Sequence, residues 1–216
     1  HQGTIDKYVG DMVMAFWGAP VRDPEHQQHA VEAALDMLRA LPALSEEFER
    51  RGWPAVRIGI GLHSGPMNVG DMGSSFRRAY TVIGDAVNVS SRLESLTKYY
   101  GVSMLVSNTT REAVKGIAFR RLDRVRVVGK MEPTDIYEPV CAEAELQPAR
   151  AAELAAHEDA MRAYFEADWD TASTAFAALA ATHPQTPVYR IFIERIAALR
   201  DQQGPGWSGV YEHTSK

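Results

Sequence analysis

The sequence has little of what marks a secreted, a membrane-spanning or a nucleic-acid-binding protein. Its single cysteine, Cys141, excludes an internal disulfide and a metal site built from several cysteines, so a reducing compartment is expected. No apolar run reaches the length of a bilayer span, and no signal peptide is visible. A basic surplus is also missing: the formal net charge is −5, which argues against a nucleic-acid partner. We therefore expect a cytoplasmic protein, or the cytoplasmic part of a longer membrane-attached sensor protein.

The start of the chain also lacks a methionine. The sequence begins with His1 and enters a strand-like segment at Thr4, so we expect it to be the downstream part of something longer. Its 216 residues, with 45% hydrophobic and 24% charged side chains, suffice for one medium-sized domain plus an appendage.

The most informative stretch is residues 80–94, YTVIGDAVNVSSRLE. It predicts a strand, a turn at Gly84 and a helix for which Asp85 is the expected N-cap. Asn88 and Arg92 are four residues apart and therefore project from one helix face. The guanidinium can fork onto phosphate oxygens while the amide orients a ring oxygen or hydroxyl. Taken alone, such a pair is more often part of a solvated helix surface.

A hairpin is predicted near the start of the chain. The β-rich runs Thr4 to Val9 and Met12 to Trp17 are separated only by Gly10 and Asp11. A carboxylate on a rigid turn is a suitable metal ligand, although aspartate is common in turns for local reasons alone.

A long helix is predicted from about Pro24 to Arg51, with Asp23 as its cap. His26 and His29 lie on this helix beside carboxylates. We interpret them as part of a solvated helix face rather than a metal cluster, because no third convergent ligand is evident.

The central part of the chain alternates further strands with short helices. Residues 55–63 form a predicted strand, and the glycine-studded run 64–73 suits close approach of a ligand or another subunit. That run is not a Walker loop, because no Gly-Lys-Ser/Thr follows it. Lys130 lies on the loop before the last predicted strand and could reach a triphosphate; an exposed loop lysine is the alternative.

Three of these motifs, in the expected order over about residues 3 to 140, resemble the class III nucleotide cyclases, the adenylate and guanylate cyclases. Residues 80–94 resemble the family's signature helix, which implies that Asn88 orients the ribose and Arg92 stabilises transition-state charge. The run DKYVGD at residues 6–11 resembles the cyclase hairpin, which implies that Asp11 is a metal ligand and that Lys7 reads the purine base.

The resemblance implies adenine as the base. The ammonium of Lys7 can donate to N1 of adenine, whereas N1 of guanine is itself protonated. The partner position is Thr81, whose hydroxyl can accept from the 6-amino group, as in a bacterial adenylate cyclase subgroup. Guanylate cyclases would place Glu and Cys at these two positions.

Other family features fit less completely. Cyclases often carry Lys-Gly-Lys where this chain has Val128, Gly129 and Lys130, so only Lys130 can inherit the phosphate role. The run 64–73 resembles the central strand pair at the family's dimer seam. The family's opening strand and helix, with its other metal Asp, are not in this sequence.

The implied fold is α+β: a ferredoxin-like or palm-type antiparallel sheet with helices on one face, over residues 1–142. The resemblance also implies a homodimer with two Mg²⁺ or Mn²⁺ ions per site, in which Asp11 and Lys7 of one subunit serve different sites. Because Asp11 alone cannot hold two metal ions, we expect these residues to be nearly inactive without the preceding segment.

The C-terminal third is predicted to be helical. Residues 143–156 form an expected linker, 157–201 resemble a tetratricopeptide unit followed by a further helix, and 202–216 form a tail with Trp207 and Tyr211. A single such unit cannot bury its own apolar face, so it should dock on the cyclase-like domain or on a protein partner.

The sequence thus predicts an adenylate cyclase that converts ATP to 3′,5′-cyclic AMP and pyrophosphate in bacterial signal transduction. The alternative is a catalytically silent module of the same fold that dimerises or senses nucleotide. A diguanylate cyclase is less favoured, because its Gly-Gly-Asp/Glu-Glu-Phe hairpin is absent.

Overall fold

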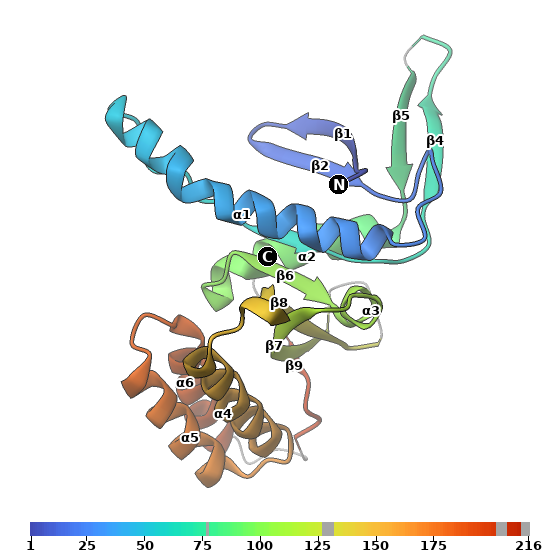
Figure 1. The fold of residues 1–216 in the computed structure, drawn as a ribbon. Coiled ribbons are helices and arrows are strands. Elements are labelled where there is room, and N and C mark those ends of the chain that lie inside the picture. Colours follow the sequence, from blue (N-terminus) through green and yellow to red (C-terminus); the bar gives the residue numbers. More distant parts are fainter. Residues whose placement is uncertain (77, 127–131, 202–206, 213–216) are drawn as a thin grey trace.

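The structure, a computed structural model, describes residues 1–76, 78–126, 132–201 and 207–212. Figure 1 shows the arrangement of its elements, which confirms an α+β architecture. In chain order they are β1 (Thr4–Val9), β2 (Met12–Phe16), α1 (His26–Arg50), β3 (Ile60–Leu62), β4 (Asn68–Gly73), β5 (Arg78–Ile83), α2 (Asp85–Tyr100), β6 (Met104–Ser107), α3 (Asn108–Ala113), β7 (Ile117–Arg126), β8 (Thr134–Ala142), a 3₁₀ turn (Glu143–Glu145), α4 (Pro148–Phe165), α5 (Trp169–Thr182), α6 (Pro187–Asp201) and β9 (Tyr211–Glu212).

The strands form a central sheet and two separate hairpins. The sheet has the order β3-β6-β8-β7-β9 and is mixed, because β3 with β6 and β7 with β9 are parallel pairs. The antiparallel hairpins β1-β2 and β4-β5 project together at one end of the molecule, and helices α4 to α6 lie at the other end (Figure 1). The sequence suggested a single antiparallel sheet, whereas the described strands form one mixed sheet and two hairpins.

Helices cover both faces of the central sheet, not one face as the sequence suggested. Met104 and Val106 of β6 share a core with Val31 on α1, whereas Leu105 between them shares a second core with Leu93 on α2. Side chains alternate along a strand, so these two cores lie on opposite faces. The apolar run from Met104 to Val106 in β6 reflects this burial on both sides.

Two predicted helix caps differ in the structure. Gly84 occupies the N-cap position of α2, and Asp85 is the first helical residue. Asp23 precedes α1, where its carboxylate accepts from the backbone N–H of Glu25 at 2.9 Å and lies 2.7 Å from Nδ1 of His29. The hydrogen bond with His29 lowers the pKa of Asp23 below its usual value. His29 thus has a structural partner at the start of α1.

The C-terminal helices dock on the cyclase-like part of the same chain. Helix α4 begins at Pro148, inside the segment expected to be a linker, because proline suits the first turn and an alanine-rich run follows it. Buried Tyr164 on α4 and Phe192 on α6 belong to the same core as Leu122 on β7 and Leu93 on α2. This packing supplies the apolar partner that an isolated helical unit would lack.

A buried ion pair anchors this junction. The guanidinium of Arg195 on α6 hydrogen-bonds to the carboxylate of Asp123 on β7, and the hydroxyl of Tyr100 at the end of α2 donates to the same carboxylate at 2.6 Å. The ring of Tyr211 in β9 lies 3.5 Å from the carbon of the Arg195 guanidinium. The last turn of α2, the sheet and the helical unit therefore meet at one carboxylate.

Across the described residues, no helix combines the length and apolar character needed to cross a membrane.

Candidate functional site

Lys7 and Thr81, the two residues expected to read a purine base, are in contact. The ammonium of Lys7 on β1 donates to the hydroxyl of Thr81 on β5 at 3.0 Å. The hairpins that carry these two residues also meet through Phe16 on β2 and Tyr80 on β5, whose ring centroids are 6.1 Å apart. Thr81 is buried and Lys7 is about half exposed, so the pair opens to solvent on the lysine side.

Asp6 completes this group, and sequence reasoning missed it. Its carboxylate accepts the hydroxyl proton of Thr81 at 2.7 Å and lies 3.5 Å from Nζ of Lys7. Regular alternation would place Asp6 and Lys7 on opposite faces of β1. The pairing register between β1 and β2 shifts between Ile5 and Lys7, which indicates a bulge, and the bulge lets both side chains turn toward β5.

Asn88 and Arg92 lie on the outward side of α2. Asn88 is exposed and Arg92 is partly exposed, whereas Val89 and Leu93 are buried in the core beneath them. Within the described ranges no ion pair engages Arg92, so its guanidinium is available to an anion. Asn88 and Arg92 thus lie on the outer face of α2, and Val89 and Leu93 lie on its buried face, as the sequence predicts.

The position of α2 depends on a close approach to β3. A Cβ atom on Gly61 would lie 2.2 Å from the carbonyl oxygen of Ser90 and 2.3 Å from the backbone nitrogen of Glu94. The hydroxyl of Ser90 donates to the carbonyl of Gly61 at 2.8 Å. Only glycine fits here. Gly61 therefore allows α2, which carries Asn88 and Arg92, to pack closely against β3. Sequence reasoning did not single out this residue.

Asp11 lies at the exposed tip of the β1-β2 hairpin. The predicted two-residue turn is confirmed: Val9 pairs with Met12, and Gly10 has a φ of 63°, a conformation that glycine adopts readily. The described residues include no group of three or more His, Cys, Asp or Glu side chains that could hold a metal ion. Asp11 supplies one carboxylate, which is too few for a divalent cation. Lys130 lies outside the described residues.

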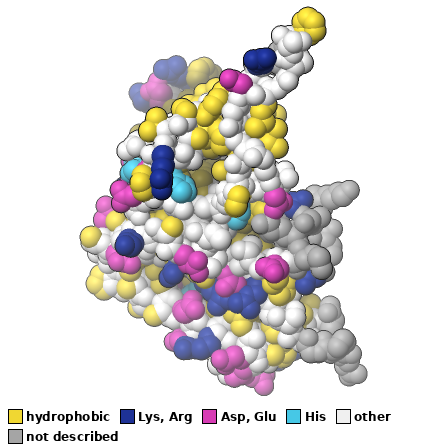
Figure 2. Space-filling model, turned by 90° about the vertical axis from the view of Figure 1, so that its right-hand side faces the viewer, with side chains coloured by type: hydrophobic (Ala, Val, Ile, Leu, Met, Phe, Trp, Pro, Cys, Tyr) yellow, Lys and Arg dark blue, Asp and Glu magenta, His cyan; other side chains and the backbone are white. Residues whose placement is uncertain are grey.

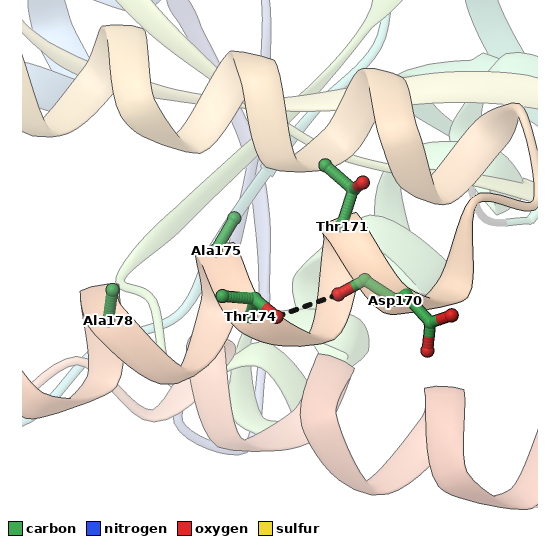
Figure 3. A pocket seen from close by; sticks show the side chains of 5 residues that line it. All are labelled: Asp170, Thr171, Thr174, Ala175 and Ala178. Carbon is green, nitrogen blue, oxygen red and sulfur yellow. Dashed lines mark hydrogen bonds between the residues drawn. The ribbon is translucent and has the colours of Figure 1, made fainter.

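The hollow in Figure 3 is a different feature of the molecule. It is lined by Asp170, Thr171, Thr174, Ala175 and Ala178, all on α5. The hydroxyl of Thr174 donates to the backbone carbonyl of Asp170 at 2.9 Å. No candidate site residue lines this hollow.

The two hairpins expose large apolar side chains. Figure 2 shows hydrophobic side chains gathered over the upper part of the molecule, where the hairpins project. The exposed fraction is 69% for Tyr8 on β1, 57% for Ile83 on β5 and 98% for Phe76 at the turn between β4 and β5. Exposed apolar surface of this kind, next to the Lys7 and Thr81 pair, is characteristic of an interaction face.

Comparison with known proteins places this geometry in a family. The family model described as the adenylate and guanylate cyclase catalytic domain matches residues 4–137. Adenylate cyclase 1 of Rhizobium meliloti is 40% identical over 141 residues, which is 65% of this chain but only 21% of that protein. The chain thus spans about a fifth of the length of that curated relative.

Solved structures agree with the family model. The adenylyl cyclase CyaB from P. aeruginosa superposes with a TM-score of 0.60 and 31% identity, over 67% of this chain and 75% of that one. The guanylate cyclase domain of RhGC from Catenaria anguillulae, solved in complex with GTP, gives a TM-score of 0.54 and 28% identity, over 65% and 73% of the two chains. The chain belongs to the family of adenylate and guanylate cyclase catalytic domains.

Proposed function

We propose that this domain forms 3′,5′-cyclic AMP and pyrophosphate from ATP. The contact between Lys7 and Thr81 supports adenine most directly, because it brings a donor for N1 and a hydroxyl for the 6-amino group to one place. The 3′-oxygen of the ribose attacks the α-phosphorus and loses its proton. The bond from that phosphorus to the bridging oxygen breaks, and pyrophosphate leaves.

Arg92 and Asn88 are the residues of α2 assigned to this step. The guanidinium of Arg92 stabilises the negative charge that develops on the phosphate oxygens, and the Asn88 amide orients the ribose for attack. The two residues are four apart, so their side chains project from one face of α2. Their accessibility supports these roles.

The active form is proposed to be a homodimer. The apolar side chains of Tyr8, Ile83 and Phe76 on the two hairpins are exposed in the single chain and would be covered by a second copy. In that arrangement Asp11 of one subunit acts at the site that contains Lys7 and Arg92 of the other.

A mixture of two inactive variants tests this sharing. Asp11→Ala and Arg92→Ala should each be inactive, while a mixed dimer retains one intact site and restores about a quarter of the wild-type rate in an equal mixture. Failure of the mixture to regain activity, with subunit exchange demonstrated, would contradict a shared site.

Divalent metal ions, two Mg²⁺ or Mn²⁺ per site, complete the proposed mechanism. Because Asp11 is a single ligand among the described residues, we propose that these 216 residues alone turn over little ATP. Substantial cyclic AMP formation by the 216 residues alone would overturn this part of the proposal.

The proposed setting is cytoplasmic signal transduction, and the direct experiment is product analysis. The complete natural protein is incubated with ATP or GTP and Mn²⁺, and cyclic nucleotides are quantified. The proposal expects cyclic AMP and little cyclic GMP. No product from either nucleotide, in a sample shown to be dimeric, would favour the silent nucleotide-sensing module instead.

A further inference from the structure

We infer that Asp6 is a specificity-determining residue, because its carboxylate fixes the Thr81 hydroxyl as a hydrogen-bond acceptor toward the purine 6-position. The inference rests on the proposed function, in which Lys7 and Thr81 face the base. Asp6 acts through Thr81 and is therefore a positioning residue. Adenine, with its 6-amino donor, is the base that this arrangement selects.

The first step concerns the proton of Thr81. A hydroxyl has one proton and two lone pairs, so a threonine can in principle serve either a donor or an acceptor on a ligand. An ionised carboxylate can only accept. The 2.7 Å contact from Thr81 to Oδ2 of Asp6 therefore commits that proton to Asp6.

The second step concerns the lone pairs. The ammonium of Lys7 has donors only, so its 3.0 Å contact occupies one lone pair of the Thr81 hydroxyl. One lone pair is left. It can accept from the 6-amino group of adenine, whereas the 6-oxygen of guanine or hypoxanthine is itself an acceptor and would face it unfavourably.

The third step explains why Asp6 does not contact the ligand itself. The Asp6 side chain is only 1% exposed, while that of Lys7 is 45% exposed. The Lys7 ammonium lies 3.5 Å from Oδ1 of Asp6. The buried negative charge of Asp6, which desolvation would penalise in isolation, therefore has a cationic partner. The bulge between Ile5 and Lys7 is what places both charges beside Thr81.

The test compares nucleotides that differ only at the purine 6-position. ATP is compared with purine ribonucleoside triphosphate, which keeps the N1 acceptor but lacks the 6-amino group, and with inosine triphosphate, which carries a 6-oxygen. In Asp6→Asn the side-chain amide can donate to Thr81 and free the hydroxyl proton for the ligand. The ratio of kcat/KM for ATP over each analogue should fall roughly tenfold from the wild-type ratio.

Two further measurements separate a specificity role from a structural one. Asp170→Asn makes the same charge change at a side chain that is 94% exposed on α5, and its ratios should match the wild type. Binding of the 3′-deoxy nucleotides, which lack the attacking hydroxyl, is measured by calorimetry and should show the same shift in preference without turnover.

The outcomes distinguish this inference from the proposed function. Equal losses with all three nucleotides in Asp6→Asn would overturn the inference and leave the cyclase activity standing. An absence of cyclic product, with an Asp6-dependent preference for 3′-deoxy-ATP, would support the inference and overturn the proposed function. If Asp6→Asn does not fold, Thr81→Ser should keep the ATP preference that Thr81→Val loses, and equal ratios in both would overturn the inference.

Discussion

The ammonium of Lys7 donates a hydrogen bond to the hydroxyl of Thr81 at 3.0 Å, although the two residues are 74 positions apart in the chain. They belong to different hairpins, β1-β2 and β4-β5, which share no strand pairing in the described structure. The contact therefore depends on how the hairpins pack, through Phe16 and Tyr80, and through the shared carboxylate of Asp6. In the proposed function, substrate choice therefore depends on the packing of the two hairpins.

Thr81→Val removes the hydroxyl while keeping the shape of the side chain. We expect kcat/KM for ATP to fall about tenfold, mainly through a higher KM, because the base contact is present in both ground and transition states. Steady-state kinetics measure this, with Thr174→Val on exposed α5 as the control. A fall in kcat at unchanged KM would contradict a role in reading the base.

Gly61→Ala should displace α2 from the sheet. The new Cβ would overlap the backbone at Ser90 and Glu94, which cannot yield in the way that a flexible side chain can. We expect a loss of at least about 2 kcal/mol in unfolding free energy and a lower turnover rate. Denaturant unfolding and initial rates test this, with Ser91→Ala on the exposed side of α2 as a control. Wild-type stability in Gly61→Ala would show that the close approach is not required.

Breaking the buried ion pair between Asp123 and Arg195 should be costly. Asp123 is fully buried and Arg195 is 5% exposed, so Arg195→Met leaves a carboxylate without its cation and lowers the unfolding free energy by about 3–5 kcal/mol. The double change, with Asp123→Asn added, should lose less than the sum of the two single losses.

The control for that pair is Arg200→Met. Arg200 pairs with Asp170, which is 94% exposed, so its loss should be below about 1 kcal/mol. Equal effects of Arg195→Met and Arg200→Met in urea unfolding would mean that the junction does not depend on the buried pair.

His157 should make stability fall in mild acid. Burial lowers its pKa from 6.5 to about 4, and its Nε2 lies 2.6 Å from the carbonyl oxygen of Arg121. Below pH 6.5 the unfolded chain binds a proton that the folded chain refuses until about pH 4, so stability is lost as pH falls through this window. The loss at pH 5 amounts to about 2 kcal/mol.

His157→Gln isolates this contribution. Unfolding free energies are measured in urea at pH 7 and pH 5 for both proteins. The variant should lose about 2 kcal/mol less than the wild type between the two pH values. The same loss in both proteins would rule out His157 as the group responsible.

Local signals in the sequence predicted much of the fold. The Gly10 and Asp11 turn, the helix face of Asn88 and Arg92, and the helices around Asp168 all follow from short-range patterns, and the structure confirms them. Asp168, for example, accepts from the backbone N–H of Thr171 at the start of α5.

The features that escaped prediction depend on non-local packing. Strict alternation pointed Asp6 away from Lys7, and only the bulge against β2 reverses this. The apolar run of β6 indicates burial on both sides, but which helix covers each face depends on how α1 and α2 pack. Likewise, the pairing of Asp123 with Arg195 joins segments 72 residues apart. Long-range contacts of this kind leave no periodic trace in the sequence.

The most direct test of the account is the effect of Arg92→Ala on cyclic AMP formation by the complete natural protein. Lys98→Ala, on the exposed last turn of the same helix, serves as the matched control, and circular dichroism checks that both variants are folded. The account predicts a fall of at least about a hundredfold in kcat for Arg92→Ala and a near-wild-type rate for Lys98→Ala. Retention of the wild-type rate by folded Arg92→Ala would contradict the assignment of α2 as the catalytic helix.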